Sequence, residues 1–201
     1  YGWMGEDHVV CSLRESGVGL DWFRADIGLE FFSYIDADDP GLISEYLELY
    51  TAREVAIIHA IADPRISPWA LTYGDIAMKN TLLHPPDWLR REFFPRLKRI
   101  NDAYHEHGII CLFHSDGYLM EVMDDLVAAG IDGINPIETV AGMDVGELYR
   151  RYGKKLFLTG GIDMSQLLSR GTPEQVRTVC RKAVADAPTG YFMGSTTEID
   201  A

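Results

Sequence analysis

The segment 108–138 constrains the fold more than any other part of this sequence. Its apolar run at 109–113 has the length and the branched side chains of a strand buried on both faces. Apolar residues over 119–127 then recur at helical spacing, and Gly130 stands where a left-handed helix cap belongs. A second apolar run follows at 131–137. This order predicts a βαβ unit with two parallel strands.

Polar residues follow both predicted strands. His114 and Asp116 come directly after the first strand, whereas Asn135 and Glu138 lie at the end of the second. Groups at the carboxyl ends of parallel strands face the binding crevice of such folds, and residues two apart on a strand share a face. We therefore predict that His114, Asp116 and Glu138 are catalytic and that Asn135 orients the substrate.

Strand and helix alternate through most of the remaining chain. Helix-start signals with proline predict helices over 39–62, 85–107 and 172–187, the second of them interrupted by Pro95. Further strands are expected at 66–73, 155–159 and 190–194, and a short helix at 144–152. The polar residues after these strands are predicted to bind substrate: Asp75, Asp163, Thr197 and Glu198. For Asp163, capping of the next helix is the alternative.

The predicted class is α/β with a parallel sheet, because about six strands alternate with helices and no Asn-Gly or Asp-Gly hairpin separates apolar runs. A doubly wound sheet should carry a glycine-rich fingerprint after its first strand, and none is present. Polar groups at the strand ends favour a (β/α)8 barrel of the TIM type. A closed barrel takes about 250 residues, so the 201 residues predict one domain over 1–201, a truncated barrel of about six β/α units.

Four local expectations complete this picture. The run 8–13 is either the first strand or a surface hairpin or extended arm, and the aromatic residues of 21–35 are expected to pack against the sheet. His84 is expected at the surface. Glu54 is expected on the solvated face of its helix.

Composition restricts the class of partner. The net charge of −13 argues against nucleic acid and anionic membranes, which require clustered Lys and Arg. Three widely spaced cysteines suit reduced thiols in the cytoplasm, and no apolar run approaches the roughly 18 residues that cross a bilayer. A small-molecule substrate is expected, and homodimerisation is left open.

Several segments, in order along the chain, resemble one family. HSDGYLMEVMDDLVAAGIDGINPIE, YGKKLFLTGGID, GTPEQV and GYFMGSTTEID are similar to segments of the uroporphyrinogen decarboxylase superfamily. This superfamily also contains methyltransferases that move methyl groups between corrinoid proteins and thiols or methoxylated compounds. The resemblance covers about 66–201. It implies a (β/α)8 barrel that the chain enters near the third strand and leaves before the last helix.

The resemblance implies three functions. The first is methyl transfer or demethylation with a corrinoid protein as partner and zinc as cofactor, in which His114 and Asp116 are metal ligands or an acid–base pair. Asp116 and Thr197 then stand where the zinc-dependent members have cysteines, and Glu198 is a substitute ligand. The second is a cofactor-free decarboxylase of porphyrin biosynthesis, although the family's substrate-contacting His is missing from 193–197. The third is a truncated barrel without catalysis, acting in binding or assembly.

Overall fold

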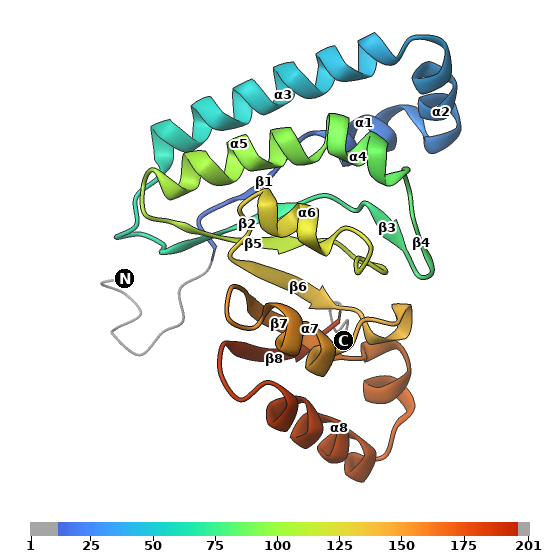
Figure 1. Cartoon of the computed structure of the whole chain (residues 1–201), viewed down its shortest axis with the longest axis vertical. Helices are drawn as coiled ribbons and strands as arrows, with labels where there is room; N and C mark the ends of the chain where they lie inside the picture. The colour runs from blue at the N-terminus through green and yellow to red at the C-terminus, as the bar shows by residue number, and fades with distance from the viewer. Residues whose placement is uncertain (1–11, 197–201) are drawn as a thin grey trace.

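A six-stranded parallel sheet forms the centre of the computed structural model, which describes residues 12–196 (Figure 1). The strands pair in the order β1-β2-β5-β6-β7-β8, which is also their order along the chain. This arrangement confirms the α/β class and the parallel sheet. The strands are β1 (Glu15–Gly17), β2 (Trp69–Tyr73), β5 (Ile110–His114), β6 (Gly133–Ile137), β7 (Phe157–Ile162) and β8 (Tyr191–Ser195).

Helices connect the strands and cover one face of the sheet (Figure 1). Right-handed crossovers between strands that are neighbours both in sequence and in space place all connections on the same side. The long α3 packs on α5, which in turn contacts β5 and β2. The helices are α1 (Leu20–Ile27), α2 (Leu29–Asp38), α3 (Pro40–Ile61), α4 (Pro86–Glu92), α5 (Phe94–His105), α6 (Met123–Ala128), α7 (Val145–Tyr152) and α8 (Pro173–Asp186), with shorter turns η1 (Thr139–Ala141) and η2 (Met164–Leu168).

Side chains alternate along the strands between the helix-covered face and the other face. Thr72 and Phe113 point toward the helices and are fully buried. Their neighbours Tyr73 and His114 are only half-buried and lie side by side in the sheet register. Because the strand period is two residues, all side chains in register with His114 lie on this uncovered face. The sheet thus presents a polar inner face at the end where its strands finish.

Three local elements differ from what the sequence predicts. The first described strand is β1, which follows the run 8–13 where a first strand was considered, and 8–11 lie outside the described residues. A small antiparallel hairpin, β3 (Ala77–Met78) with β4 (Thr81–Leu82), was not predicted. The helix after β5 starts only at Met123 because the chain first makes turns over 115–122.

Burial also differs from two expectations. His84 is 7% exposed and stacks on Trp88 at 4.1 Å between ring centroids, rather than lying at the surface. Glu54 is 1% exposed because Arg14 forms a bidentate ion pair with it. Among the aromatic residues of 21–35, Phe32 is buried in the core, but Trp22 and Phe31 are 53% and 56% exposed.

The described sheet is open. β1 and β8 form its two ends, and neither pairs with the other. The strand order never reverses, in contrast to a doubly wound sheet, whose order changes direction at a switch point.

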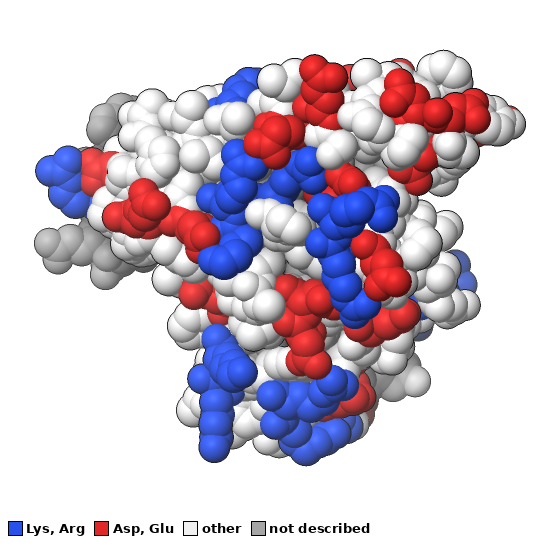
Figure 2. Space-filling model, turned by 45° about the horizontal axis from the view of Figure 1, so that its top comes forward, with Lys and Arg blue, Asp and Glu red and all other residues white. Residues whose placement is uncertain are grey.

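The helix-covered surface carries mixed charge. Figure 2 shows acidic and basic side chains intermingled on the face toward the viewer. Ion pairs between helices or their flanking residues include Arg90 with Asp125 and Arg99 with Glu48. In the described part of the chain, no helix has the length and apolarity needed to cross a bilayer.

Candidate functional site

A cavity of about 570 Å³ lies on the inner face of the sheet, at the carboxyl ends of the strands. Five strands or their following residues contribute to its wall. It is therefore formed by the sheet as a whole rather than by one loop. Its lining includes Glu15 from β1, Asp75 after β2, His114 and Asp116 at the end of β5, Asn135 from β6 and Ser195 from β8.

Three predicted site residues converge in this cavity. One ligand atom each from Asp75, His114 and Asp116 lies within 4.8 Å of the other two. They meet because β2 and β5 are adjacent, with Tyr73 paired to His114, and each strand passes directly into its polar residues. One imidazole and two carboxylates are suitable ligands for a divalent cation such as Zn²⁺. The donor set therefore fits a metal ion.

The His114 ring is oriented by a chain of hydrogen bonds across the sheet. Asn135 Nδ2 donates to Thr159 Oγ1 at 2.6 Å, which turns Asn135 Oδ1 toward the imidazole. Nδ1 of His114 lies 2.7 Å from this oxygen and donates its proton to it. The other ring nitrogen, Nε2, then carries the free lone pair. A histidine held in this way is prepared to act as a metal ligand or as a base.

Two backbone contacts hold the turn after β5 in place. Asp116 N donates to Asp75 Oδ1 at 3.1 Å, and Gly117 N donates to Glu138 Oε2 at 2.6 Å. Gly117 has φ +91°, and a Cβ there would lie 2.7 Å from the Ala77 carbonyl carbon. The position thus requires glycine. Glu138, which was predicted to be catalytic, does not line the cavity. Its carboxylate instead binds the backbone of the turn that carries Asp116 and orients this turn.

Asp116 has the electrostatic setting of a proton donor. Partial burial raises the pKa of its carboxyl group. The nearby His114 opposes this rise, whereas the carboxylates of Asp75 and Glu138 add to it. A carboxyl group with a raised pKa retains its proton at higher pH and can deliver it as a general acid.

An ion pair from α1 clamps Asp75, a contact that the sequence did not reveal. Asp21 Oδ1 accepts a hydrogen bond from Asp75 N at 3.1 Å, and Arg24 Nη2 donates to Asp75 O at 2.6 Å. Arg24 and Asp21 also bind each other at 2.5 Å. The residues are 51 and 54 positions apart from Asp75, so only the folded chain brings them together. The one sequence signal for this contact was the spacing of Asp21 and Arg24, which at i and i+3 on a helix can form an ion pair.

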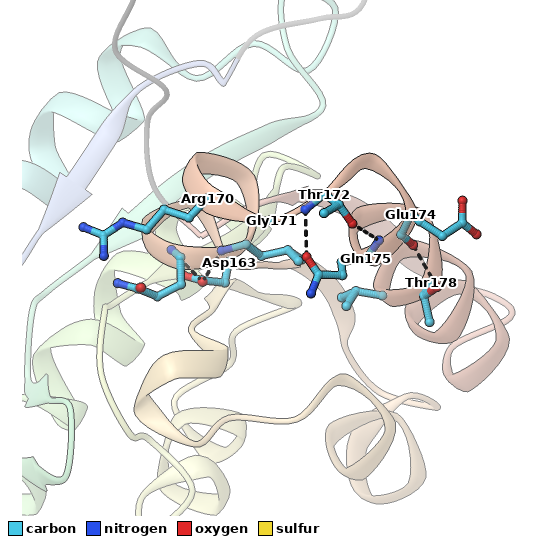
Figure 3. A pocket seen from close by; sticks show the side chains of 10 residues that line it. Asp163, Arg170, Gly171, Thr172, Glu174, Gln175 and Thr178 are labelled. Atoms are coloured by element: carbon cyan, nitrogen blue, oxygen red, sulfur yellow. Dashed lines mark hydrogen bonds between the residues drawn. The ribbon is translucent and has the colours of Figure 1, made fainter.

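Asp163 does not line this cavity and instead caps η2. Its carboxylate accepts hydrogen bonds from the backbone N–H groups of Ser165, Gln166 and Leu167 and from the Ser165 hydroxyl. These bonds lower its pKa, although burial opposes them. This geometry agrees with the alternative interpretation of Asp163, in which it caps the next helix, and not with substrate binding in this cavity. Asp163 lines a separate groove of about 810 Å³ between η2 and α8. Figure 3 shows it there together with Arg170, Thr172 and Gln175. Of the remaining predicted residues, Thr197 and Glu198 lie outside the described residues.

Six of the ten residues that line the cavity were not predicted as site residues, among them Glu15 and Tyr73. Glu15 lies on a strand of only three residues, which has no recognisable apolar pattern. Tyr73 was assigned to its strand, but its place on the inner face follows only from the pairing with β1 and β5.

The structure is that of an α/β protein with polar side chains gathered at the carboxyl edge of a parallel sheet. Among solved structures, the chain is similar to a methyltransferase from Methanosarcina mazei, with a TM-score of 0.75 and 15% sequence identity. The match covers 96% of this chain and 55% of that one, so the chain spans about half the length of that protein. At this identity the likeness concerns the fold alone.

An uncharacterized protein matches less well, with a TM-score of 0.39 and 11% identity over 71% of this chain and 37% of that one. At this TM-score the two folds are not comparable. No protein-family profile matches the sequence. No curated protein matches it either.

Proposed function

We propose that this chain forms part of a methyl-transferring enzyme of the uroporphyrinogen decarboxylase superfamily, on a (β/α)8 barrel of which about six units are present. The convergence of Asp75, His114 and Asp116 at the carboxyl edge of the sheet is the observation that carries the proposal. The fold shared with a methyltransferase supports it. The methyl donor or acceptor is a corrinoid held by a partner protein, and the other substrate is a small molecule.

The proposed roles follow from the contacts of each side chain. Asp75, His114 and Asp116 would hold zinc, which when bound supplies Lewis acidity toward the acceptor or leaving atom. Asn135 holds the imidazole in one tautomer, and Glu138 positions the turn after β5. In the absence of metal, Asp116 would act as the general acid, a role supported by its place in the cavity wall and by its raised pKa. The placement of Thr197 and Glu198 as further ligands or substrate contacts stays a prediction.

Decarboxylation of a tetrapyrrole acid is less well supported. Such a substrate carries several carboxylates, which need cationic anchors. Among the described residues that line the cavity, none is Lys or Arg, and three are acidic. The charge of this wall repels a polyanionic substrate.

Zinc binding provides the direct test. We expect titration calorimetry to detect one Zn²⁺ per chain and Asp75→Asn, His114→Ala and Asp116→Asn each to weaken the affinity at least tenfold. The control Asp87→Asn removes a carboxylate from the exposed ion pair with Arg90, away from the cavity, and should not change the affinity.

A second possible ligand trio requires its own control. His105, Cys111 and Asp132 also approach one another, at the amino ends of β5 and β6. If Asp132→Asn abolished zinc binding and Asp116→Asn did not, the proposed site would be wrong. Transfer of a methyl group from methylcobalamin to a thiol, followed by corrinoid absorbance, then tests the reaction, and Asp116→Asn should reduce its rate at least tenfold.

A further inference from the structure

A second cavity adjoins the first and has a different chemical character. It has a volume of about 490 Å³ and lies between α1, α3 and the end of the sheet formed by β1 and β2. Glu15 and Tyr73 line both cavities, so the two share a wall. We call the second cavity the aromatic lobe because four aromatic rings line it: Trp22, Tyr46, Tyr50 and Tyr73.

The rings of the aromatic lobe are held in fixed positions. Trp22 Nε1 donates a hydrogen bond to Tyr73 Oη at 2.7 Å, which ties α1 to β2. Phe23 stacks on Tyr46 at 4.3 Å between centroids and supports that ring. Tyr46 and Tyr50 are 6.1 Å apart with their planes tilted by 31°. The faces of aromatic rings carry negative quadrupole potential, so rings that line a cavity attract a cation that enters it.

The charges of the two cavities favour a cation. Arg14 lines the aromatic lobe, but its guanidinium is engaged in the ion pair with Glu54. Arg53 is then the one described guanidinium at the lobe for which the structure shows no carboxylate partner, and it lies 5.5 Å from the centroid of Tyr50. The positive charge of Arg53 is outweighed by the carboxylates of Glu15 and Asp26, which line the aromatic lobe. The carboxylates of Asp75 and Asp116 line the adjoining cavity and add further negative charge.

We propose that the aromatic lobe binds the methylated ammonium group of a cationic small molecule. The rings receive the methyl-covered charge by cation–π attraction, while Glu15 and Asp26 supply the opposite charge. A quaternary ammonium group suits this lobe better than the primary ammonium of a lysine or a metal ion. It is more weakly hydrated than either and has an apolar surface that can pack on the rings. Arg53 over Tyr50 is an internal example of the same interaction.

The position of the aromatic lobe links it to the proposed reaction. Tyr73 precedes Gly74 and Asp75, and it pairs with His114 in the sheet register. A molecule with its cationic group in the lobe therefore extends toward the three converging ligands. Its use as a methyl donor or acceptor rests on the proposed function, whereas its binding does not.

Binding of choline tests the inference. We expect calorimetric or NMR titration to detect saturable choline binding, and much weaker binding of the neutral alcohol in which a tert-butyl group replaces trimethylammonium. Trp22→Ala should weaken choline binding about fivefold, and Glu15→Gln should weaken it about twofold to threefold. Phe31→Ala is the matched control, because Phe31 is as exposed as Trp22 but does not line the lobe.

Arg53 separates a cation site from an anion site. Arg53→Gln should strengthen choline binding, since it frees the face of Tyr50 and removes a repelling charge. Equal binding of choline and its neutral analogue, absence of choline binding, or preferential binding of benzoate that Arg53→Gln abolishes would each overturn the inference. Because these titrations are made without zinc, failure of zinc binding leaves their outcome unaffected, and the two proposals fail separately.

Discussion

Gly117 is the residue on which the geometry of the candidate site depends most directly. It has φ +91° and lies against the hairpin, with the Ala77 carbonyl carbon and Met78 O each 2.7 Å from the position of a Cβ. Its N–H donates to Glu138. A methyl group here would strain the backbone and also push β3 away.

We therefore expect Gly117→Ala to lower the free energy of unfolding by about 2–4 kcal/mol. Gly108→Ala is a matched control, because Gly108 has φ +72° but nothing within 4 Å of a Cβ. This control should cost only about 1 kcal/mol, the backbone component alone. Urea unfolding of both variants measures the difference, and equal losses would refute a steric role for the hairpin.

His84 should make stability depend on pH. Burial, with a smaller contribution from the nearby Arg24, lowers its pKa to about 4, against about 6.5 in the unfolded chain. The unfolded state then binds the proton more readily, so this contribution to stability is complete above pH 6.5 and is lost as the pH falls toward 4. The loss amounts to at most about 3 kcal/mol.

Replacing His84 by Phe should remove this component while retaining the stacking on Trp88. We expect the difference in unfolding free energy between the natural chain and His84→Phe to grow steadily in favour of the variant between pH 7 and pH 4. Chemical unfolding at several pH values measures it. A difference that does not change with pH would show that the imidazole retains its ordinary pKa in the fold.

At the scale of elements, α8 begins with the most complete capping arrangement in the described chain. Thr172 Oγ1 accepts from Gln175 N at 3.3 Å, and Gln175 Oε1 accepts from Thr172 N at 2.7 Å. We expect Thr172→Ala to reduce the free energy of unfolding by about 1 kcal/mol. Asp39 precedes α3 without a side-chain cap hydrogen bond, so Asp39→Ala should have a much smaller effect in the same thermal or urea unfolding experiment.

Elements were predictable from sequence where local signals determine them. The capping box and prolines marked the starts of α8 and α3, and β5 and β6 followed from their apolar runs. β1 was not recognisable because distant residues stabilise it: Ser16 is buried through a hydrogen bond with Tyr104, 88 positions away. The convergence of Asp75 with His114 was expected from parallel strands. Its support by Asp21 and Arg24 depends on the packing of α1, which no local pattern encodes.

At the scale of the whole molecule, ligand binding should couple the strands. Asp75, His114 and Asp116 follow β2 and β5, and a bound ion would join these strands to α1 through the clamp on Asp75. At about 100 times its dissociation constant, Zn²⁺ should add roughly 2.7 kcal/mol to the free energy of unfolding. Thermal unfolding with and without Zn²⁺ at one fixed concentration measures this, and Asp116→Asn, with an affinity at least tenfold weaker, should reduce the gain to about 1.4 kcal/mol or less. Equal stabilisation of that variant would place the ion elsewhere.

The strand order of the sheet has one further consequence. β8 has a single ladder neighbour, β7, among the described residues, and Phe192 on it is 71% exposed. Its outer edge carries backbone N–H and C=O groups that no other described strand pairs, which is the arrangement on which a further strand can be added to a sheet. The parallel strand order that brings the polar side chains together at the carboxyl ends of the strands therefore also leaves β8 as an edge strand. A strand added beside β8 would bring new side chains to the cavity wall next to Ser195.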